Sequence, residues 1–156
     1  MSNKQEEISF YDMRTWKIVK QIKHKEVINA LKWDQGDGNL FFVTDEKGQV
    51  CIFNGSTSLG QSLYTIEKCH NPPGYTMAVD SRNRYFATGG NDSQIGIWDM
   101  NSLMLIKTIS NNDARAMAVS LNHDGSLIAA ICEDDINKRY LLEVYDFNYD
   151  DPLMCG

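Results

Sequence analysis

The segment Ile95-Gly96-Ile97-Trp98-Asp99 decides the fold, because the chain repeats its pattern of β-branched and aromatic residues followed by an acid or an amide. The other three copies occupy residues 8–12, 50–54 and 142–146, so that successive copies begin 42, 45 and 47 residues apart. Short runs rich in Ile, Val, Phe, Tyr and Trp, with turn residues between them, are typical of β-strands, and none of these runs has helical spacing. The sequence therefore predicts an all-β chain with an internal repeat.

Three further strand-like segments recur in register with the aromatic one. The first carries a small Ala in a fixed place, the second is strongly apolar, and the third follows the aromatic segment. They lie at residues 28–34, 76–80 and 116–120 for the first, at 40–44, 85–89 and 127–131 for the second, and at 17–22, 62–66 and 105–109 for the third. Turn residues separate them, which indicates antiparallel hairpins. Each repeat is thus predicted to hold four strands, here called a, b, c and d in chain order.

This repeat resembles the blades of the WD-repeat β-propeller family. A unit of about 40 to 45 residues with four strands and a closing aromatic-Asp pair is characteristic of such blades. The alternative is a β-sandwich of unrelated strands, but a sandwich would not repeat the aromatic-acid pair in register. The resemblance implies a partial propeller, because the chain supplies little more than three blades and closed rings have about four to eight.

The blades are predicted to divide the chain as follows. Residues 1–26 form a partial blade with strands c and d, 27–69 and 70–112 form complete blades, 113–147 form a partial blade with strands a, b and c, and 148–156 form a tail without a strand. Because each blade buries its faces only against its neighbours, this incomplete ring is expected to need further blades. They would come from the rest of a longer chain or from a partner, and a non-functional propeller fragment is the alternative.

The blade at residues 70–112 matches the hydrogen-bonded tetrad of the WD-repeat family through His70, Thr88, Asp92 and Trp98. The resemblance implies that these side chains satisfy one another inside the blade. A His, a Thr and an Asp also occur in nucleophilic triads, but the tetrad accounts for the same residues and for the Trp. The tetrad is therefore expected to be structural, and no catalytic residue is predicted.

The other blades depart from the tetrad. In the preceding blade His24 and Thr44 are expected at tetrad positions, whereas Lys47 stands at the place of the turn Asp and Phe53 at the place of the Trp. In the following blade the corresponding residues are Ala130, Arg139 and Tyr145. These blades are expected to depend more on apolar packing.

Composition and charge exclude several classes of function. The chain has 156 residues with 42% apolar side chains and a net charge of −6, which disfavours binding to a phosphate backbone by the chain alone. Its apolar runs are short and its first residues are charged, so a membrane span and a secretory signal are not expected. The cysteines at 51, 69, 132 and 155 form no CxxC pair. Cys69 and His70 are adjacent and would point apart in extended chain, so neither a metal nor a cofactor is predicted.

Partner binding is predicted instead. In WD-repeat propellers the d–a and b–c loops share the face that usually receives partners. On these loops the sequence places five residues suited to an interface: Lys25, Tyr75, Arg115, Lys138 and Arg139. The alternative is that Tyr75 packs in its strand and that Arg115 is merely solvated.

Residues 26–44 and 84–99 resemble one branch of the family, the WD-repeat subunits of THO-type complexes. The resemblance implies a nuclear scaffold that couples transcription to mRNA processing and export. Its partners would be other protein subunits, with RNA contacted only indirectly through the assembly. Three alternatives stay open. The chain could be another WD-repeat adaptor that acts in ribosome assembly or ubiquitin ligation, its location could be cytoplasmic, or it could be an enzyme built on a propeller.

Overall fold

The computed structural model describes residues 6–56, 60–110, 114–134, 136–147 and 152–155, and all its regular elements are strands. They form one two-stranded and three four-stranded antiparallel sheets. The first sheet consists of β1 (Glu6–Asp12) and β2 (Lys17–His24), and the second of β3 (Ile28–Trp33), β4 (Leu40–Asp45), β5 (Val50–Asn54) and β6 (Tyr64–Ile66). The third consists of β7 (Gly74–Val79), β8 (Tyr85–Gly90), β9 (Gln94–Asp99) and β10 (Leu105–Ser110), and the fourth of β11 (Ala114–Leu121), β12 (Leu127–Asp134), β13 (Arg139–Asp146) and β14 (Pro152–Cys155). No helix of the described residues is long and apolar enough to span a bilayer.

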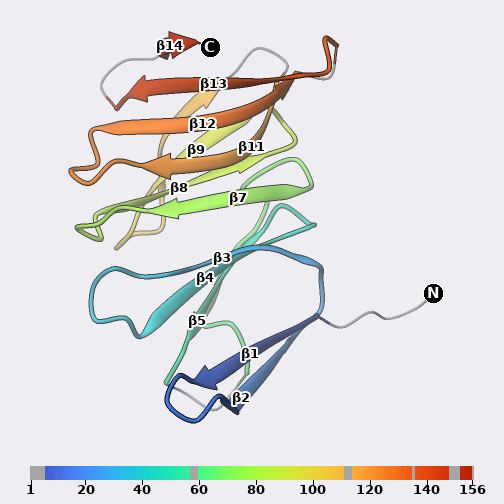
Figure 1. Cartoon of the computed structure of the whole chain (residues 1–156), viewed down its shortest axis with the longest axis vertical. Helices are drawn as coiled ribbons and strands as arrows, with labels where there is room; N and C mark the ends of the chain where they lie inside the picture. Colours follow the sequence, from blue (N-terminus) through green and yellow to red (C-terminus); the bar gives the residue numbers. More distant parts are fainter. Residues whose placement is uncertain (1–5, 57–59, 111–113, 135, 148–151, 156) are drawn as a thin grey trace.

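The four sheets stack face to face along the long axis of the molecule, with the first and fourth sheets at opposite ends (Figure 1). Because neighbouring strands are antiparallel, their connections alternate between two edges of the stack. The b–c face carries the turns that follow β4, β8 and β12 and the loops between sheets, and the a–b face carries the turns that follow β1, β3, β7 and β11. The predicted all-β, open and partial propeller is confirmed.

The core lies between the sheets rather than inside any one of them. Along β4, Phe41 and Val43 pack toward the first sheet, whereas Phe42 packs toward the third. This alternation follows from the two-residue period of a strand and buries β4 on both faces. Between the third and fourth sheets the core is built largely from small and β-branched residues, among them Ala87, Ile97 and Ala116. Each sheet is therefore stabilised by its neighbours, as the repeat pattern predicted.

The prediction of a strandless tail is wrong. β14 pairs antiparallel with β13, with Val144 opposite Met154 and Glu143 opposite Cys155. The fourth sheet is therefore a complete blade of four strands, and the described chain has 14 strands where the sequence predicted 13. The tail carries neither alternation nor an aromatic-acid pair, so its strand is defined by backbone pairing with β13 and gives no pattern in the sequence.

The turns of the a–b face link the third sheet to the fourth. Arg84 pairs with the buried carboxylate of Asp80, with Nε 2.8 Å from Oδ2, and its Nη2 also donates to the carbonyl of Asp124 at 2.6 Å. The hydroxyl of Tyr85 donates to the carbonyl of Gly125, and that of Ser81 donates to the carbonyl of His123. Neighbouring blades are thus joined by polar contacts at this edge as well as by apolar packing.

Candidate interaction site

The four tetrad residues of the third sheet form one hydrogen-bonded chain. The indole Nε1 of Trp98 donates to the hydroxyl of Thr88 at 2.9 Å, and that hydroxyl lies 2.8 Å from Nε2 of His70. Nδ1 of His70 lies 2.9 Å from Oδ1 of Asp92, whose other oxygen accepts from the backbone N–H of Asn71 at 2.8 Å. The network assigns the ring proton to Nδ1, because Nε2 must accept from Thr88. The tetrad thereby fixes the loop that enters β7 against the turn that follows β8.

Two glycines make room for the tetrad. A Cβ atom on Gly90 would lie 2.6 Å from the imidazole ring of His70, and one on Gly96 would lie 2.7 Å from the indole nitrogen of Trp98. Side chains at these positions would push the His or the Trp out of hydrogen-bonding distance. The tetrad therefore requires glycine at positions 90 and 96, although neither residue belongs to the tetrad itself.

The second sheet has no tetrad, and the expected place of Thr44 is wrong by one residue. Thr88 pairs with Gly96 in the third sheet and Val43 pairs with Cys51 in the second, so Val43 occupies the tetrad position and Thr44 points to the other face. The buried hydroxyl of Thr44 has no hydrogen-bond partner among the described residues. His24 instead contacts Asp45, with Nε2 3.2 Å from Oδ2, so the acid comes from the strand and not from the turn.

The fourth sheet replaces the tetrad by a different buried pair. Ala130 stands at the position of Thr88, and the hydroxyl of Tyr145 donates to Oε2 of Glu143 at 2.6 Å. Both side chains are buried. Arg139, expected at the place of the turn Asp, begins β13 and lies with Nε 3.5 Å from Oδ2 of Asp134. The loop between β12 and β13 is therefore not held by a buried histidine.

One group of described residues has donor types that suit a metal ion. His24, Asp45 and Cys51 bring their ligand atoms within 4.8 Å of one another. The Asp45 carboxylate, however, is already used by the turn: its Oδ1 accepts from the backbone N–H groups of Lys47 at 2.9 Å and Gln49 at 3.1 Å, while Oδ2 contacts His24. Burial raises the pKa of the Cys51 thiol, which favours the protonated form over a metal-binding thiolate. The contacts of His24 and Asp45 are therefore explained by a turn that the Asp45 carboxylate caps.

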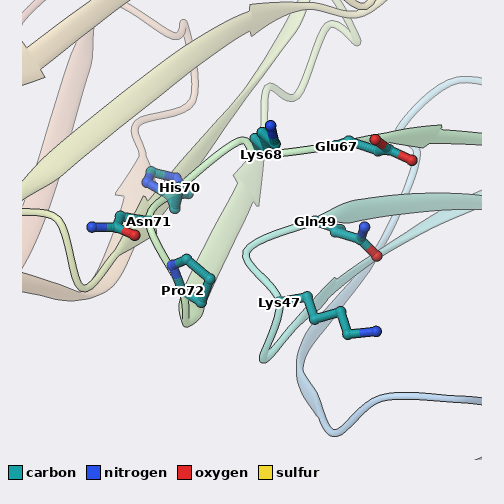
Figure 2. Close-up of a pocket in the computed structure, with 7 residues that line it drawn as sticks. All are labelled: Lys47, Gln49, Glu67, Lys68, His70, Asn71 and Pro72. Atoms are coloured by element: carbon teal, nitrogen blue, oxygen red, sulfur yellow. The ribbon is translucent and has the colours of Figure 1, made fainter.

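A concavity of about 490 Å³ opens on the b–c face beside the tetrad. In Figure 2, Lys47 and Gln49 line one side from the turn before β5. The other side comes from the loop that leads to β7 and is lined by Glu67, Lys68, His70, Asn71 and Pro72. His70 belongs to both structures, since its ring is held by Thr88 and Asp92 while its residue lines the concavity. The tetrad therefore supports one wall of this surface from behind.

The charges around the concavity are mixed. Nζ of Lys47 lies 2.5 Å from Oε1 of Glu26, and this hydrogen bond, together with the charge of Glu26, raises the pKa of Lys47. Lys68 and Glu67 are both exposed on the opposite wall. Burial raises the pKa of the neighbouring Cys69 to about 12, so its thiol stays protonated and unreactive. The surface offers polar and charged contacts for docking, without an activated nucleophile among its described residues.

The five residues predicted for partner binding do not form one cluster. Lys25 is exposed in the loop between β2 and β3, and Lys138 and Arg139 are exposed at the opposite end of the stack, around the turn after β12. Tyr75 and Arg115 lie within strands β7 and β11 and are partly buried. The hydroxyl of Tyr75 lies 3.4 Å from Oδ1 of Asn91. None of the five lines the concavity.

The concavity cannot be predicted from the sequence because its walls come from two loops that are distant in the chain. In the sequence Lys47 stands out only as a departure from the tetrad, and Lys68 and Asn71 belong to no motif. The available signal was Pro72-Pro73 in the loop that holds Lys68 and Asn71, together with a Lys at the usual place of an Asp. Only the stacking of the sheets shows that these two loops face each other.

Stacked four-stranded sheets with this tetrad define the fold of WD-repeat proteins, here an open and partial propeller. Residues 60–99 match the family described as WD domain, G-beta repeat. Among solved structures, the WD40 repeats of RRP9 superpose with a TM-score of 0.72 at 16% identity, over 85% of this chain and 39% of that one. The likeness to RRP9 establishes the fold alone.

The chain is similar to several curated proteins of this class. THO complex subunit 3 of Arabidopsis thaliana is 27% identical over 134 residues, which are 86% of this chain and 41% of that protein. Protein RAE1 of Arabidopsis thaliana is 32% identical over 73% of this chain and 36% of its own length. Eukaryotic translation initiation factor 3 subunit I of Scheffersomyces stipitis is 26% identical over 88% of this chain and 38% of its own length. The chain thus spans about two fifths or less of each of these relatives.

Proposed function

We propose that this chain is a non-enzymatic WD-repeat scaffold that holds other protein subunits together on its b–c face. The concavity between Lys47 and Pro72 carries this proposal, because it is an open, mixed-charge surface with one wall supported by the tetrad. A rigid wall reduces the entropy lost when a partner docks. Lys68 and Asn71 offer hydrogen-bonding groups there.

The lining residues favour docking over catalysis. Both ring nitrogens of His70 are engaged within the tetrad, and Lys47 is paired with Glu26. A general base needs a free nitrogen within reach of its substrate, and a nucleophile needs a lowered pKa or an adjacent base. The described residues of the concavity meet neither requirement.

We further propose that the assembly is a THO-type complex that couples transcription to mRNA processing and export in the nucleus. The similarity to THO complex subunit 3 supports this, because it extends over 86% of the chain. Both a nuclear location and other THO-type protein subunits as partners belong to this proposal. RNA would be held by the assembly in this role.

Affinity purification from RNase-treated nuclear extract tests the proposal. The tagged chain is expected to recover THO subunits, and Lys68→Glu is expected to reduce their recovery because it reverses a charge on the exposed wall. Arg82→Glu is the matched control, since Arg82 is exposed on the opposite, a–b face. Recovery of ribosome-assembly factors or ubiquitin ligase components without THO subunits would assign the chain to another adaptor. Equal recovery by Lys68→Glu and Arg82→Glu would place the interface elsewhere.

A further inference from the structure

Positive charge is concentrated in one short stretch of the chain, which runs from the end of β1 through the turn and β2. Five of its 15 basic residues but only one of its 21 acidic residues lie between positions 11 and 25, which leaves ten basic and 20 acidic residues elsewhere. These basic residues are Arg14, Lys17, Lys20, Lys23 and Lys25. At physiological salt the Debye length is about 8 Å, so this local charge acts on an anion largely independently of distant acids. The stretch from the closing turn through β2 is therefore positive on an acidic protein, whereas Glu6 and Glu7 lie at the other end of β1.

Two exposed aromatic rings stand at the closing turn of the hairpin of β1 and β2. Trp16 is 71% exposed and Tyr11 is 53% exposed. The turn is well defined: Oδ1 of Asp12 accepts from the backbone N–H of Arg14 at 2.7 Å, and the N–H of Trp16 donates to the carbonyl of Asp12 at 2.7 Å. The single acid of the segment thus caps the turn that carries the rings.

The cations nearest the rings are the most available ones. Arg14 and Lys17 are exposed and flank Trp16 in the chain. Lys20 is held over the ring of Phe10, with Nζ 5.3 Å from the centroid and 3.1 Å from the carbonyl of Gly55. Lys23 stands opposite Glu7 in the strand pairing, which offsets its charge. Lys17 stands opposite Asp12, whose Oδ1 accepts from the N–H groups of Arg14 and Thr15. The turn therefore combines two exposed cations with two exposed aromatic rings.

We propose that this turn itself binds single-stranded RNA, in addition to the contacts that the assembly would make, with Trp16 and Tyr11 stacking on bases and Arg14 and Lys17 contacting phosphates. Cations beside exposed ring faces are the combination by which proteins hold single strands without reading their sequence. An acidic peptide without apolar or aromatic side chains would use the cations but would leave the two rings uncovered. The concavity beside the tetrad is lined by no residue of this hairpin. The site lies on the a–b face, away from the proposed protein-docking surface, and does not depend on it.

Fluorescence anisotropy with a labelled 12-nucleotide oligouridylate tests the proposal on the whole chain. Binding is expected at 50 mM salt and is expected to weaken steeply as salt rises. Trp16→Gly should weaken binding on the order of tenfold, since a stacked base contributes that much to affinity. Trp16 has a φ of 55°, a backbone conformation that suits glycine, so this variant is expected to keep its fold and its thermal midpoint. Tyr64→Ala is the matched control, because Tyr64 is 58% exposed at another strand.

The double variant Arg14→Gln with Lys17→Gln tests the phosphate contacts. Each phosphate contact to a single strand contributes about 0.7 to the slope of log affinity against log salt, so this variant should lower the slope by about 1.4. Arg82→Gln with Lys138→Gln removes two exposed charges elsewhere and should leave the slope unchanged.

Three outcomes would overturn the proposal. The first is the absence of binding at 50 mM salt, and the second is equal RNA binding by Trp16→Gly and the unmodified chain. The third is displacement of the RNA by a polyglutamate peptide, if that peptide binds Trp16→Gly and the unmodified chain equally well. The last result would assign the turn to an acidic protein partner. Because the pull-down of THO subunits is done after RNase treatment, failure here leaves that test intact.

Discussion

At the scale of single residues, the hydroxyl of Thr88 satisfies two buried groups at once. It accepts from Trp98 and lies within hydrogen-bonding distance of His70. Thr88→Val would leave the indole N–H and a ring nitrogen buried without a partner, which costs about 3 kcal/mol in free energy of unfolding. Urea denaturation followed by circular dichroism measures this loss.

Thr44 supplies the matched control, because its hydroxyl is buried without any partner. Thr44→Val replaces this hydroxyl by a methyl of similar size, so the variant is expected to match the unmodified chain or to exceed its stability by up to about 1 kcal/mol. The same substitution is thus expected to lower the free energy of unfolding at Thr88 and to leave it unchanged or raise it at Thr44. Equal losses at Thr88 and Thr44 would show that the tetrad does not stabilise the blade.

These two threonines also show where sequence reasoning stops at this scale. The tetrad of the third sheet could be predicted from residue types and spacing alone. In the second sheet Val43 and Thr44 are neighbours, and a shift of one residue moves a side chain to the other face of the sheet. The type of residue favoured Thr44, but the pairing of Val43 with Cys51 decides otherwise. Register depends on how two strands pair, so it cannot be derived from the sequence of either strand alone.

At the scale of elements, the turn between β11 and β12 packs tightly on the third sheet. Gly125 has a φ of 72°, and a Cβ atom there would overlap the Tyr85 hydroxyl, the Asp80 carboxylate and the Arg84 guanidinium. Gly125→Ala is therefore expected to destabilise the fold by about 3 kcal/mol, through backbone strain and overpacking together. Thermal and urea unfolding both report this change.

Gly38 separates the two contributions. Its φ is 70°, but a Cβ atom there would meet nothing within 4 Å. Gly38→Ala should therefore cost only the backbone strain, about 1 kcal/mol. If both variants lose the same stability, the contact between the turn and the third sheet contributes nothing measurable.

The turns of the a–b face should also respond to acid. Burial opposes ionisation of Asp80, but the hydrogen bonds and charge of Arg84 outweigh it and lower the pKa of this carboxyl. A folded-state pKa below the unfolded one stabilises the protein above the unfolded value of about 3.9, and this contribution is lost as the pH falls through the lowered folded-state pKa. Asp80→Asn lacks this contribution, so its unfolding free energy should fall less between pH 5 and pH 2 than that of the unmodified chain. Parallel curves for the two proteins would contradict this assignment.

Most strands could be predicted because each is a short apolar run with its own aromatic or β-branched residues. β14 could not, since Pro152–Cys155 has no alternating pattern and is a strand only by pairing with β13. The concavity was missed for a related reason: Lys47 and Lys68 lie 21 positions apart in different loops and come together only in the folded chain. The local sequence pattern predicts single strands, whereas a surface formed by two loops can be recognised only once the packing of the sheets is known.

At the scale of the whole molecule, one face of the fourth sheet has no neighbouring sheet among the described residues. In the third sheet Ala87, Gly89, Ile95 and Ile97 are buried beneath the fourth sheet. Strand register places Ala129, Ile131, Leu142 and Val144 at the same positions of the fourth sheet. Ile131 and Leu142 face each other across β12 and β13 and are 43% and 51% exposed. The last sheet therefore presents the kind of face by which the third sheet receives its neighbour.

Exposed apolar faces of this kind drive association, so the chain is expected to self-associate as its concentration rises. Leu142→Lys places a charge in the middle of this face and should shift the chain toward monomer in sedimentation velocity. It should leave the free energy of unfolding nearly unchanged, because the side chain it replaces is already half exposed. Leu63→Lys is the matched control, since Leu63 is 57% exposed just before β6. A lysine buried without a partner in an interface is costly, so Leu142→Lys must weaken any association through the face of β12 and β13. If both variants sediment like the unmodified chain at every concentration, this face does not mediate association.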